Sequence, residues 1–576
     1  MKAYARTFGV ALAVVVALMV ATHQVGLAKW WAPHGAYRAQ TQALLEGHFA
    51  LTDRPQALRH DLAWAGGGVQ HVWGLGVPLW QLPFEAVAEL GGFAPFPDRV
   101  PMILWLTLAA FLVLRAVQDP WERAGACLLT IGLPAFVALL RGRVNVYEEA
   151  AAYAYTAGIA LLAGLLILRR RPTAQRYLLL VGFAGLGGLV RPTVWFYGLG
   201  TLAIATALLV RAIGWRRALA PIAIGGALFV AGGGALYATN ALRFGSGTEF
   251  GHRLNLELIP GNLYATRFDN LYARAGWLEG AEELGGALFD QPETRAELDG
   301  FYQTHLAAGE SPRQRFREYY FTVFTWWYVP LLAGGALLAG LAWRRRGDPV
   351  ARVTGAWAAL GLAPLAIFYI HAPSLTSRYL LDLAPAFAAL LLLVWRWAVA
   401  KHAQLAAAAL ALLWVAAILS STVLRRPSVA RRADAIAQTE ALAAPDPTAY
   451  HIPDGWTLAS HPPLTLSGLF LDGMDWDPET GSVPAATFFY TQDPQFVEII
   501  VAGPPDTDWQ HDIRANLDGE HLALTSATRA GDGAMWLHFA ASAPHHGLAL
   551  AFVAFGHAPD LATDAGPFRL LAIRWR

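Results

Sequence analysis

Two adjacent carboxylates open one of the long apolar runs of this 576-residue chain. Glu148 and Glu149 follow a polar turn that begins at Arg141, and they directly precede an apolar stretch that begins near Ala150. An ionisable group at the mouth of an apolar run costs free energy unless it is paired or hydrated, so such groups are functional candidates. A carboxylate placed there can act as a general base that takes a proton from a hydroxyl. The alternative is that both residues only supply negative charge to a helix N-terminus, which is favourable.

A third candidate carboxylate, Asp61, lies in a polar segment rich in histidine and glycine, and we predict Asp61, Glu148 and Glu149 as the catalytic residues. The histidines near Asp61 lack the tight spacing of a zinc site. Cys127 is the one cysteine, which excludes an internal disulfide and a cysteine-based zinc site. The sequence therefore assigns no metal ligands and no certain cofactor, and a bound divalent metal stays an alternative.

Three arginines at the ends of apolar runs suit a phosphate ligand. The guanidinium groups of Arg191, Arg243 and Arg378 present a planar fork that matches phosphate oxygens. Arg378 and Asp382 are four residues apart, so an ion pair on one helix face is the alternative. Aromatic and histidine side chains near the same ends complete the predicted binding site. The predicted substrate-binding residues are His34, Tyr37, His60, His71, Tyr147, Arg191, Arg243, Arg378 and Tyr379.

Membrane-spanning helices must position these residues, because 55% of the chain is hydrophobic and only 15% is charged. An ordinary soluble domain carries about a quarter charged residues. About eleven apolar runs are long enough to cross a bilayer. The first is either a cleaved signal peptide or an anchor, and we treat it as a retained anchor. The runs begin near Phe8, Val100, Ala124, Ala150, Tyr177, Val194, Ala218, Phe321, Val353, Tyr379 and Leu405.

Arginine clusters between alternate runs predict the orientation. Because short loops rich in Lys and Arg stay in the cytoplasm, the side that carries these clusters is the cytoplasmic one. The outer side then receives residues 29–98, residues 240–320 and the turns that carry the candidate residues, so all candidates face the same side although they lie far apart in the sequence. The net charge of +1 provides no basic field that would attract nucleic acid.

The outer segments differ in their sequence patterns. Residues 33–51 read as an amphipathic surface helix, residues 72–90 as an interfacial segment broken by two prolines, and residues 280–320 as helical. Residues 425–445 form a predicted linker. Residues 446–576 show short apolar runs separated by Gly, Pro, Asp and Asn, which predicts an outer domain resembling a β-sandwich. The predicted fold is a mainly α multi-pass membrane protein with this soluble β-rich domain.

Residues 1–424 resemble the GT-C superfamily of glycosyltransferases, which use polyprenyl-phosphate-linked sugars and include protein mannosyltransferases and the aminoarabinose transferase of lipid A. Four segments carry the resemblance: AYRAQTQALLEGHFAL (36–51), VYEEA (146–150), NALRFGSGTEFG (240–251) and SRYLLDLAP (377–385). The resemblance implies transfer of a sugar from a polyprenyl phosphate to a glycan, lipid or protein acceptor. It also implies a bacterial inner membrane, with the C-terminal domain on the periplasmic side.

This chain departs from the family directly after the first span. Members usually place an acidic residue there, whereas this chain reads Trp31, Ala32, Pro33, His34. Asp61 or Asp53 would substitute from further along the loop, and Glu148 or Glu149 matches the second acidic position of the family.

Other functions stay open at this point. A non-catalytic membrane scaffold that binds lipid or glycan would use the same outer arginines, and so would a polymer ligase acting on a lipid pyrophosphate. A polysaccharide transporter would need charged residues near the bilayer midplane and two halves related by an internal repeat. The sequence shows few such charges and no repeat.

Overall fold

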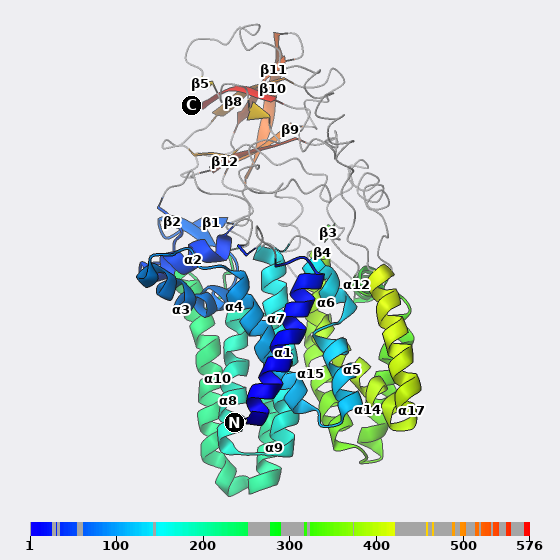
Figure 1. Cartoon of the computed structure of the whole chain (residues 1–576). Helices are drawn as coiled ribbons and strands as arrows, with labels where there is room; N and C mark the ends of the chain where they lie inside the picture. The colour runs from blue at the N-terminus through cyan, green and yellow to red at the C-terminus, as the bar shows by residue number, and fades with distance from the viewer. Residues whose placement is uncertain are drawn as a thin grey trace.

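The computed structural model is a helical bundle that carries small strands at one end, with further strands late in the chain (Figure 1). The predicted mainly helical fold of the membrane part is confirmed for the residues that the structure describes. These residues are 2–25, 30–31, 35–53, 62–141, 144, 146–251, 277–289, 316–318, 323–372, 374–420, 457–458, 464–465, 487–489, 496–502, 513–517, 520–531, 534–540, 549–554 and 569–575.

The bundle is built from eleven apolar helices among the described residues. They are α1 (Lys2–Ala21), α4 (Arg99–Ala116), α5 (Pro120–Thr130), α6 (Pro134–Arg141), α7 (Val146–Arg170), α8 (Ala174–Val190), α9 (Val194–Ile213), α10 (Trp215–Phe244), α14 (Tyr328–Arg344), α15 (Pro349–His371) and α17 (Ala384–Ser420). Seven helical segments in the described chain are long and apolar enough to cross a membrane, and the bent pair α5 and α6 makes an eighth if it is one span. α8 and α14 are shorter apolar helices of the same bundle. The chain therefore has the helices of a multi-pass membrane protein.

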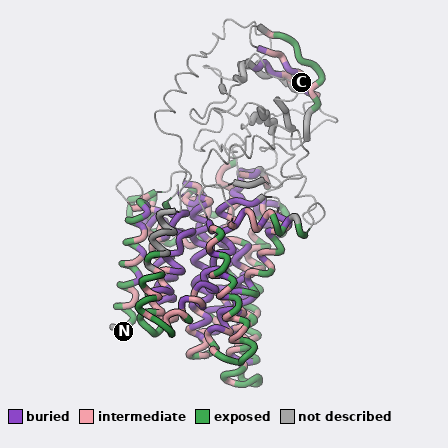
Figure 2. Tube along the Cα trace, turned by 90° about the vertical axis from the view of Figure 1, so that its right-hand side faces the viewer, coloured by how far each residue is buried: buried purple, intermediate pink, exposed green. Residues whose placement is uncertain are grey.

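α7 is more buried than any other candidate span. Small residues let its neighbours come close, as at Gly158, where an added Cβ would lie 2.8 Å from Cγ of Pro385. Buried residues run through the length of the bundle (Figure 2). The packing of α7 therefore fixes its first turn, which carries Glu148 and Glu149.

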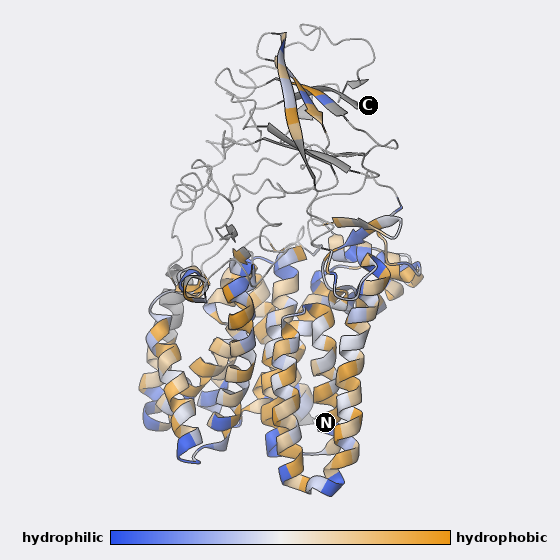
Figure 3. Cartoon of the chain, turned by 180° about the vertical axis from the view of Figure 1, so that it is seen from behind, coloured by the Kyte–Doolittle hydropathy of each residue, from blue (hydrophilic) through white to orange (hydrophobic). Residues whose placement is uncertain are grey.

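Basic residues gather at one end of the bundle. Because successive helices alternate in direction, the C-termini of α4, α7, α9 and α14 lie at the same end as the N-termini of α5, α8, α10 and α15. Figure 3 shows hydrophilic residues at this end and hydrophobic residues along the helices. We call this end, which holds Arg115, Arg169, Arg211 and Arg344, the arginine-rich end. The opposite end, where α7 begins, is the site end.

α17 contains a break. His402 has φ −150° and ψ 69°, which lie outside the helical region, so two helices meet at this residue. The sequence predicted separate apolar runs from near Tyr379 and from near Leu405, and the break falls between those positions.

A small layer of elements covers part of the site end (Figure 1). It consists of α2 (Ala36–Leu45), β1 (Leu62–Ala65), β2 (Gly68–His71) and α3 (Gly76–Gly91), with α2 packed on α3 and β1 paired antiparallel with β2. The surface helix predicted over residues 33–51 is confirmed at Ala36–Leu45. Residues 76–91, within and just beyond the segment predicted to be interfacial, form the 16-residue helix α3, which contains Pro83 and contacts α8.

Two glycines let this layer approach the bundle. A Cβ on Gly74 would lie 2.3 Å from the carbonyl oxygen of Leu189, and one on Gly76 would lie 2.5 Å from the backbone nitrogen of Val190. Both contacts are with backbone, so no larger residue fits without a shift. The chain between β2 and α3 is therefore held against the turn that carries Arg191.

The later outer elements also meet at the site end. β3 (Phe316–Glu318) pairs in parallel with β4 (Ser374–Thr376), which leads into α16 (Ser377–Leu380) and the 3₁₀ helix η3 (Leu381–Leu383). α12 (Trp277–Phe289) confirms the start of the helix predicted over residues 280–320. The prediction is wrong at Phe316–Glu318, where pairing with β4 produces a strand.

The described strands of the C-terminal region form one nine-stranded sheet in the order β5-β13-β8-β11-β10-β9-β12-β7, with β6 paired to β13. β10 pairs with both β11 and β9, and its register with β11 shifts twice. The prediction that residues 446–576 are rich in β-strands is confirmed for these segments. The predicted linker, residues 425–445, lies outside the described residues. The strands are β5 (Thr457–Leu458), β6 (Leu464–Thr465), β7 (Thr487–Phe489), β8 (Phe496–Ala502), β9 (Ile513–Leu517), β10 (Glu520–Gly531), β11 (Ala534–Ala540), β12 (Ala549–Ala554) and β13 (Arg569–Trp575).

Candidate functional site

Glu149 forms a buried ion pair with Arg99 between α7 and α4. Nη1 of Arg99 donates to Oε1 of Glu149 at 3.0 Å, and Nη2 donates to the carbonyl of Val144 at 2.9 Å. The two side chains are 3% and 2% exposed. Sequence reasoning missed Arg99, whose one signal was its position immediately before an apolar run. The pair ties the first turn of α7 to the start of α4.

Glu148 faces a different arginine. Nη1 of Arg378, on α16, lies 3.5 Å from Oε1 of Glu148, and both side chains are 8% exposed. The guanidinium of Arg378 also lies 4.2 Å from the centre of the Tyr147 ring, in a cation–π contact. The Thr376 hydroxyl accepts a hydrogen bond from the backbone N–H of Tyr379 and caps α16, which positions Arg378. The structure thus brings the predicted residues Tyr147, Glu148 and Arg378 together.

Arg191 ends α8 and pairs with Asp382 of η3. Its Nε donates to Oδ2 of Asp382 at 2.9 Å, and the Tyr369 hydroxyl donates to the same oxygen at 2.5 Å. The Tyr379 ring centre lies 5.1 Å from the guanidinium. Burial disfavours the charge on Arg191, but the Asp382 carboxylate and the two tyrosines outweigh it and raise the pKa of Arg191 above its ordinary value. Arg191 is therefore a permanent cation.

The ion pair that the sequence offered as an alternative for Arg378 and Asp382 is not formed. Arg378 pairs with Glu148 of α7, and Asp382 pairs with Arg191 at the end of α8. Arg191 and Asp382 are 191 residues apart in the sequence. Contacts between helices, and not contacts along one helix, determine the partners.

An aromatic cluster connects the outer layer to these charges. Ring centres are 5.3 Å apart for Tyr37 and His71, 4.3 Å for His71 and Trp73, and 5.2 Å for Trp73 and Tyr147, all edge to face. Tyr147 is the residue on which Arg378 lies. Four segments of the chain, α2, β2, the chain after β2 and α7, therefore meet beside Glu148.

The His71 ring and the Tyr37 hydroxyl are buried polar groups, and the backbone of Trp73 lies near the His71 ring. Both ring nitrogens of His71 and the hydroxyl of Tyr37 are buried and lack a hydrogen-bond partner within the described chain. Burial, and then the charge of Arg243, lower the pKa of His71 well below its ordinary value of 6.5, so the ring is neutral. Burial raises the pKa of Tyr37 above its ordinary value. Unsatisfied buried polar atoms of this kind suit an ordered water or a hydroxyl of a ligand.

Arg243 holds the loop after β2 in place. Its Nη1 donates to the carbonyl of His71 at 2.8 Å and to that of Trp73 at 3.1 Å, and its Nη2 donates to Oδ1 of Asn240 at 2.9 Å. The side chain is buried, with 2% of the residue exposed. The predicted residue therefore lies at the site, where its contacts position His71 and Trp73.

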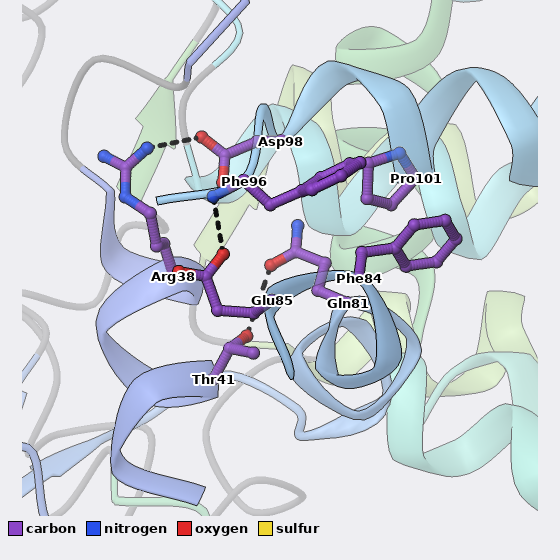
Figure 4. Close-up of a pocket in the computed structure, with 8 residues that line it drawn as sticks. All are labelled: Arg38, Thr41, Gln81, Phe84, Glu85, Phe96, Asp98 and Pro101. Carbon is purple, nitrogen blue, oxygen red and sulfur yellow. Dashed lines mark hydrogen bonds and ion pairs between the residues drawn. The ribbon is translucent and has the colours of Figure 1, made fainter. Parts of the chain in front are cut away.

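A second group of charges lines a small cavity between α2, α3 and the start of α4 (Figure 4). Nη1 of Arg38 donates to Oδ2 of Asp98 at 3.0 Å, and Oε2 of Glu85 accepts from the Phe96 N–H at 2.8 Å. The Gln81 amide oxygen faces the Thr41 hydroxyl at 3.4 Å. The cavity volume is about 10 Å³, which is about the space of one water molecule. Sequence reasoning missed this cavity, because its residues come from three elements.

The described part of the chain contains no group of three or more His, Cys, Asp or Glu residues that could hold a metal ion. Three predicted site residues, His34, His60 and Asp61, lie outside the described residues. The described residues Tyr37, His71, Tyr147, Glu148, Glu149, Arg191, Arg243, Arg378 and Tyr379 all lie at the site end.

Comparison of the chain with models of protein families and with curated proteins finds no match.

Proposed function

We propose that the chain is a membrane glycosyltransferase that moves a sugar from a polyprenyl-phosphate donor to a glycan, lipid or protein acceptor. One observation carries this proposal: Arg191, Arg378 and Glu148, which belong to three separate helical segments, converge at the site end of an apolar bundle. Two cations beside a carboxylate suit a phosphate leaving group and a general base.

The proposed topology follows the sequence. The site end faces the periplasm from a bacterial inner membrane, with residues 29–98 and 240–320 outside and the arginine-rich end in the cytoplasm. Counting α5 with α6 as one span, α8 and α14 as spans and the two halves of α17 separately gives about eleven crossings. The nine strands of the C-terminal region are proposed to fold as a β-sandwich on the outer side.

The donor phosphate is proposed to bind Arg378 and Arg191. Phosphate competes with Glu148 for Arg378, so donor binding releases the carboxylate at the moment when a base is needed. Glu148 then takes the proton of an acceptor hydroxyl, the acceptor oxygen attacks the anomeric carbon, and the sugar–phosphate C–O bond breaks with its electron pair leaving on the phosphate. Glu149, held by Arg99, fixes the helix turn, and Asp61 is the alternative base.

The test is transfer of radiolabelled sugar from synthetic polyprenyl-phosphate donors by the purified full chain in lipid nanodiscs. Glu148→Gln should lower turnover by about 100-fold or more. Glu89→Gln removes an exposed carboxylate of α3 and should leave turnover unchanged. Equal turnover in Glu148→Gln and wild type would exclude Glu148 as the base, and Asp61→Asn would then identify the remaining candidate.

A non-catalytic scaffold that binds lipid or glycan is the second candidate. It is favoured by the ion pairing of four carboxylates at the site end, Asp98, Glu148, Glu149 and Asp382, since paired carboxylates are poor bases. Saturable binding of the donor that is lost in Arg191→Gln, without turnover of any donor, would support the scaffold over the enzyme.

A further inference from the structure

Five arginines form a cluster at the arginine-rich end. They are Arg115 at the end of α4, Arg123 on α5, and Arg169, Arg170 and Arg171 at the end of α7. A hydrogen bond from Arg170 to the backbone of Arg115 joins the ends of α7 and α4, and hydrogen bonds from Arg123 to Val117 and Gln118 place α5 beside the end of α4. α4 packs against α7 and against α5, which explains how three helices bring them together.

No member of the cluster forms an ion pair with a carboxylate in the described part of the chain. Arg170 donates to the carbonyl of Arg115, and Arg123 donates to the carbonyls of Val117 and Gln118 at 3.2 Å and 2.9 Å. These contacts orient the side chains but neutralise no charge. Nε of Arg169 is buried and lacks a hydrogen-bond partner.

Arg396 lies at the same end and, unlike the five clustered arginines, forms ion pairs with carboxylates. Arg396 forms ion pairs with Asp348 at 2.8 Å and with Glu122 at 3.1 Å. Helix C-termini attract cations, and basic residues collect at a cytoplasmic end for topological reasons, so a cluster alone does not imply a ligand. Here, however, both ion pairs form at Arg396, and the Asp348 carboxylate, which also attracts Arg169, is shared between the two arginines, so positive charges outnumber the carboxylates near the cluster.

The surroundings of the cluster suit a lipid. The guanidinium of Arg115 lies 4.1 Å from the centre of the Tyr4 ring, and Tyr4 and Trp121 are 50% and 45% exposed, as expected of aromatic side chains at a membrane interface. α1 packs on α4, and the sides of α1 turned away from α4 expose apolar side chains that include Val10 and Val16. A headgroup bound to the arginines would thus have its acyl chains along α1.

We propose that this cluster of five arginines binds the phosphate headgroup of an anionic phospholipid, with the acyl chains against α1. The planar guanidinium forks match phosphate oxygens, and basic pockets between membrane helices bind anionic headgroups. The apolar face of α1 favours a lipid over free phosphate. This site lies at the opposite end from Glu148, so it is independent of the proposed transfer reaction.

The experiment is native mass spectrometry of the purified full chain, titrated with phosphatidylglycerol, phosphatidylcholine or inorganic phosphate. Wild type should bind phosphatidylglycerol more tightly than phosphatidylcholine. Arg115→Gln combined with Arg170→Gln should weaken phosphatidylglycerol binding by about 30-fold, from two charges near an anionic headgroup. The matched control, Arg211→Gln with Arg216→Gln, removes two exposed arginines at the same end and should leave binding as in wild type.

Three outcomes would overturn the proposal. Equal weakening in the control pair would mean that only the overall charge matters. Equal affinity for the two lipids would mean that the headgroup charge is not recognised, and displacement of phosphatidylglycerol by millimolar inorganic phosphate would assign the cluster to a soluble anion. Thiol reactivity of Cys127, the one cysteine and a half-buried one, verifies that each variant is folded.

Discussion

Breaking the Arg99–Glu149 pair should destabilise the bundle, whereas removing both partners should not. Both side chains are almost completely buried, at 3% and 2% exposure, and Nε of Arg99 lacks a hydrogen-bond partner in the described chain. A buried charge left without its partner costs about 3 to 5 kcal/mol. Replacement of a buried pair by apolar residues of similar volume is often neutral or stabilising. Glu149→Leu alone should therefore lower the free energy of unfolding by about 3 to 5 kcal/mol.

The assay is equilibrium unfolding in mixed micelles with increasing sodium dodecyl sulfate, followed by the reactivity of the Cys127 thiol. That cysteine belongs to α5, which packs on α4, so it reports on the same part of the bundle. Arg99→Met combined with Glu149→Leu should recover most of the lost stability. The exposed Glu46–His48 pair is the control, and Glu46→Gln should leave unfolding unchanged.

Two results would refute this reasoning about the pair. Wild-type stability in Glu149→Leu would mean that the arginine finds another partner or water. A double variant as unstable as Glu149→Leu would mean that packing, and not the unpaired charge, dominates the cost. Turnover measured on the stable double variant then also tests whether Glu149 takes part in the reaction beyond fixing the helix turn.

Three further outcomes are expected. Gly74→Ala should destabilise the outer layer, because its Cβ would lie 2.3 Å from a backbone oxygen, whereas Gly226→Ala, with open space around its Cβ, should be tolerated; thermal unfolding compares the two. The pKa of His71 in the folded chain lies well below 6.5, so as the pH falls the unfolded chain binds a proton at this residue first. The free energy of unfolding should therefore fall below pH 6.5, by up to about 1.4 kcal/mol per pH unit. In His71→Phe, the free energy of unfolding should depend less steeply on pH. Arg191→Lys keeps a cation but loses the planar fork, so donor binding should weaken by about tenfold or more in a scintillation proximity assay, and unchanged binding would exclude a bidentate phosphate contact.

The sequence was most informative where a feature depended on one segment. Apolar runs predicted the helices of the bundle, and the acidic residues before Ala150 predicted the charged first turn of α7. It was least informative about partners. The spacing of Arg378 and Asp382 offered a pair along one helix, but these residues lie in α16 and η3 and pair with Glu148 and Arg191.

The residues that sequence reasoning missed share a physical property. Arg99, Asp98 and Glu85 are buried charged residues, and nothing in the local sequence distinguishes them from ordinary charges beside an apolar run. Glu85 and Asp98 line the cavity between α2, α3 and α4, and Arg99 lies between α4 and α7, so their burial is set by tertiary packing. Arg243 shows the converse. It was predicted as a phosphate ligand, and both of its Nη groups donate to the protein, to two carbonyls and an amide oxygen, whereas its Nε has no hydrogen-bond partner among the described residues.

The two adjacent carboxylates of α7 therefore differ in what they can do. Glu149 accepts a hydrogen bond at 3.0 Å from an arginine that is itself fixed by the Val144 carbonyl, so exchange of its partner would leave a buried cation unpaired. Glu148 lies 3.5 Å from Arg378, beyond the range of a strong hydrogen bond, and that arginine also contacts an aromatic face. A phosphate that replaces Glu148 at Arg378 would keep the arginine paired and would leave the Glu148 carboxylate without this partner, which favours its uptake of a proton. In the proposed transfer reaction, the partner exchange is therefore assigned to the Glu148–Arg378 pair and not to the more buried Glu149–Arg99 pair.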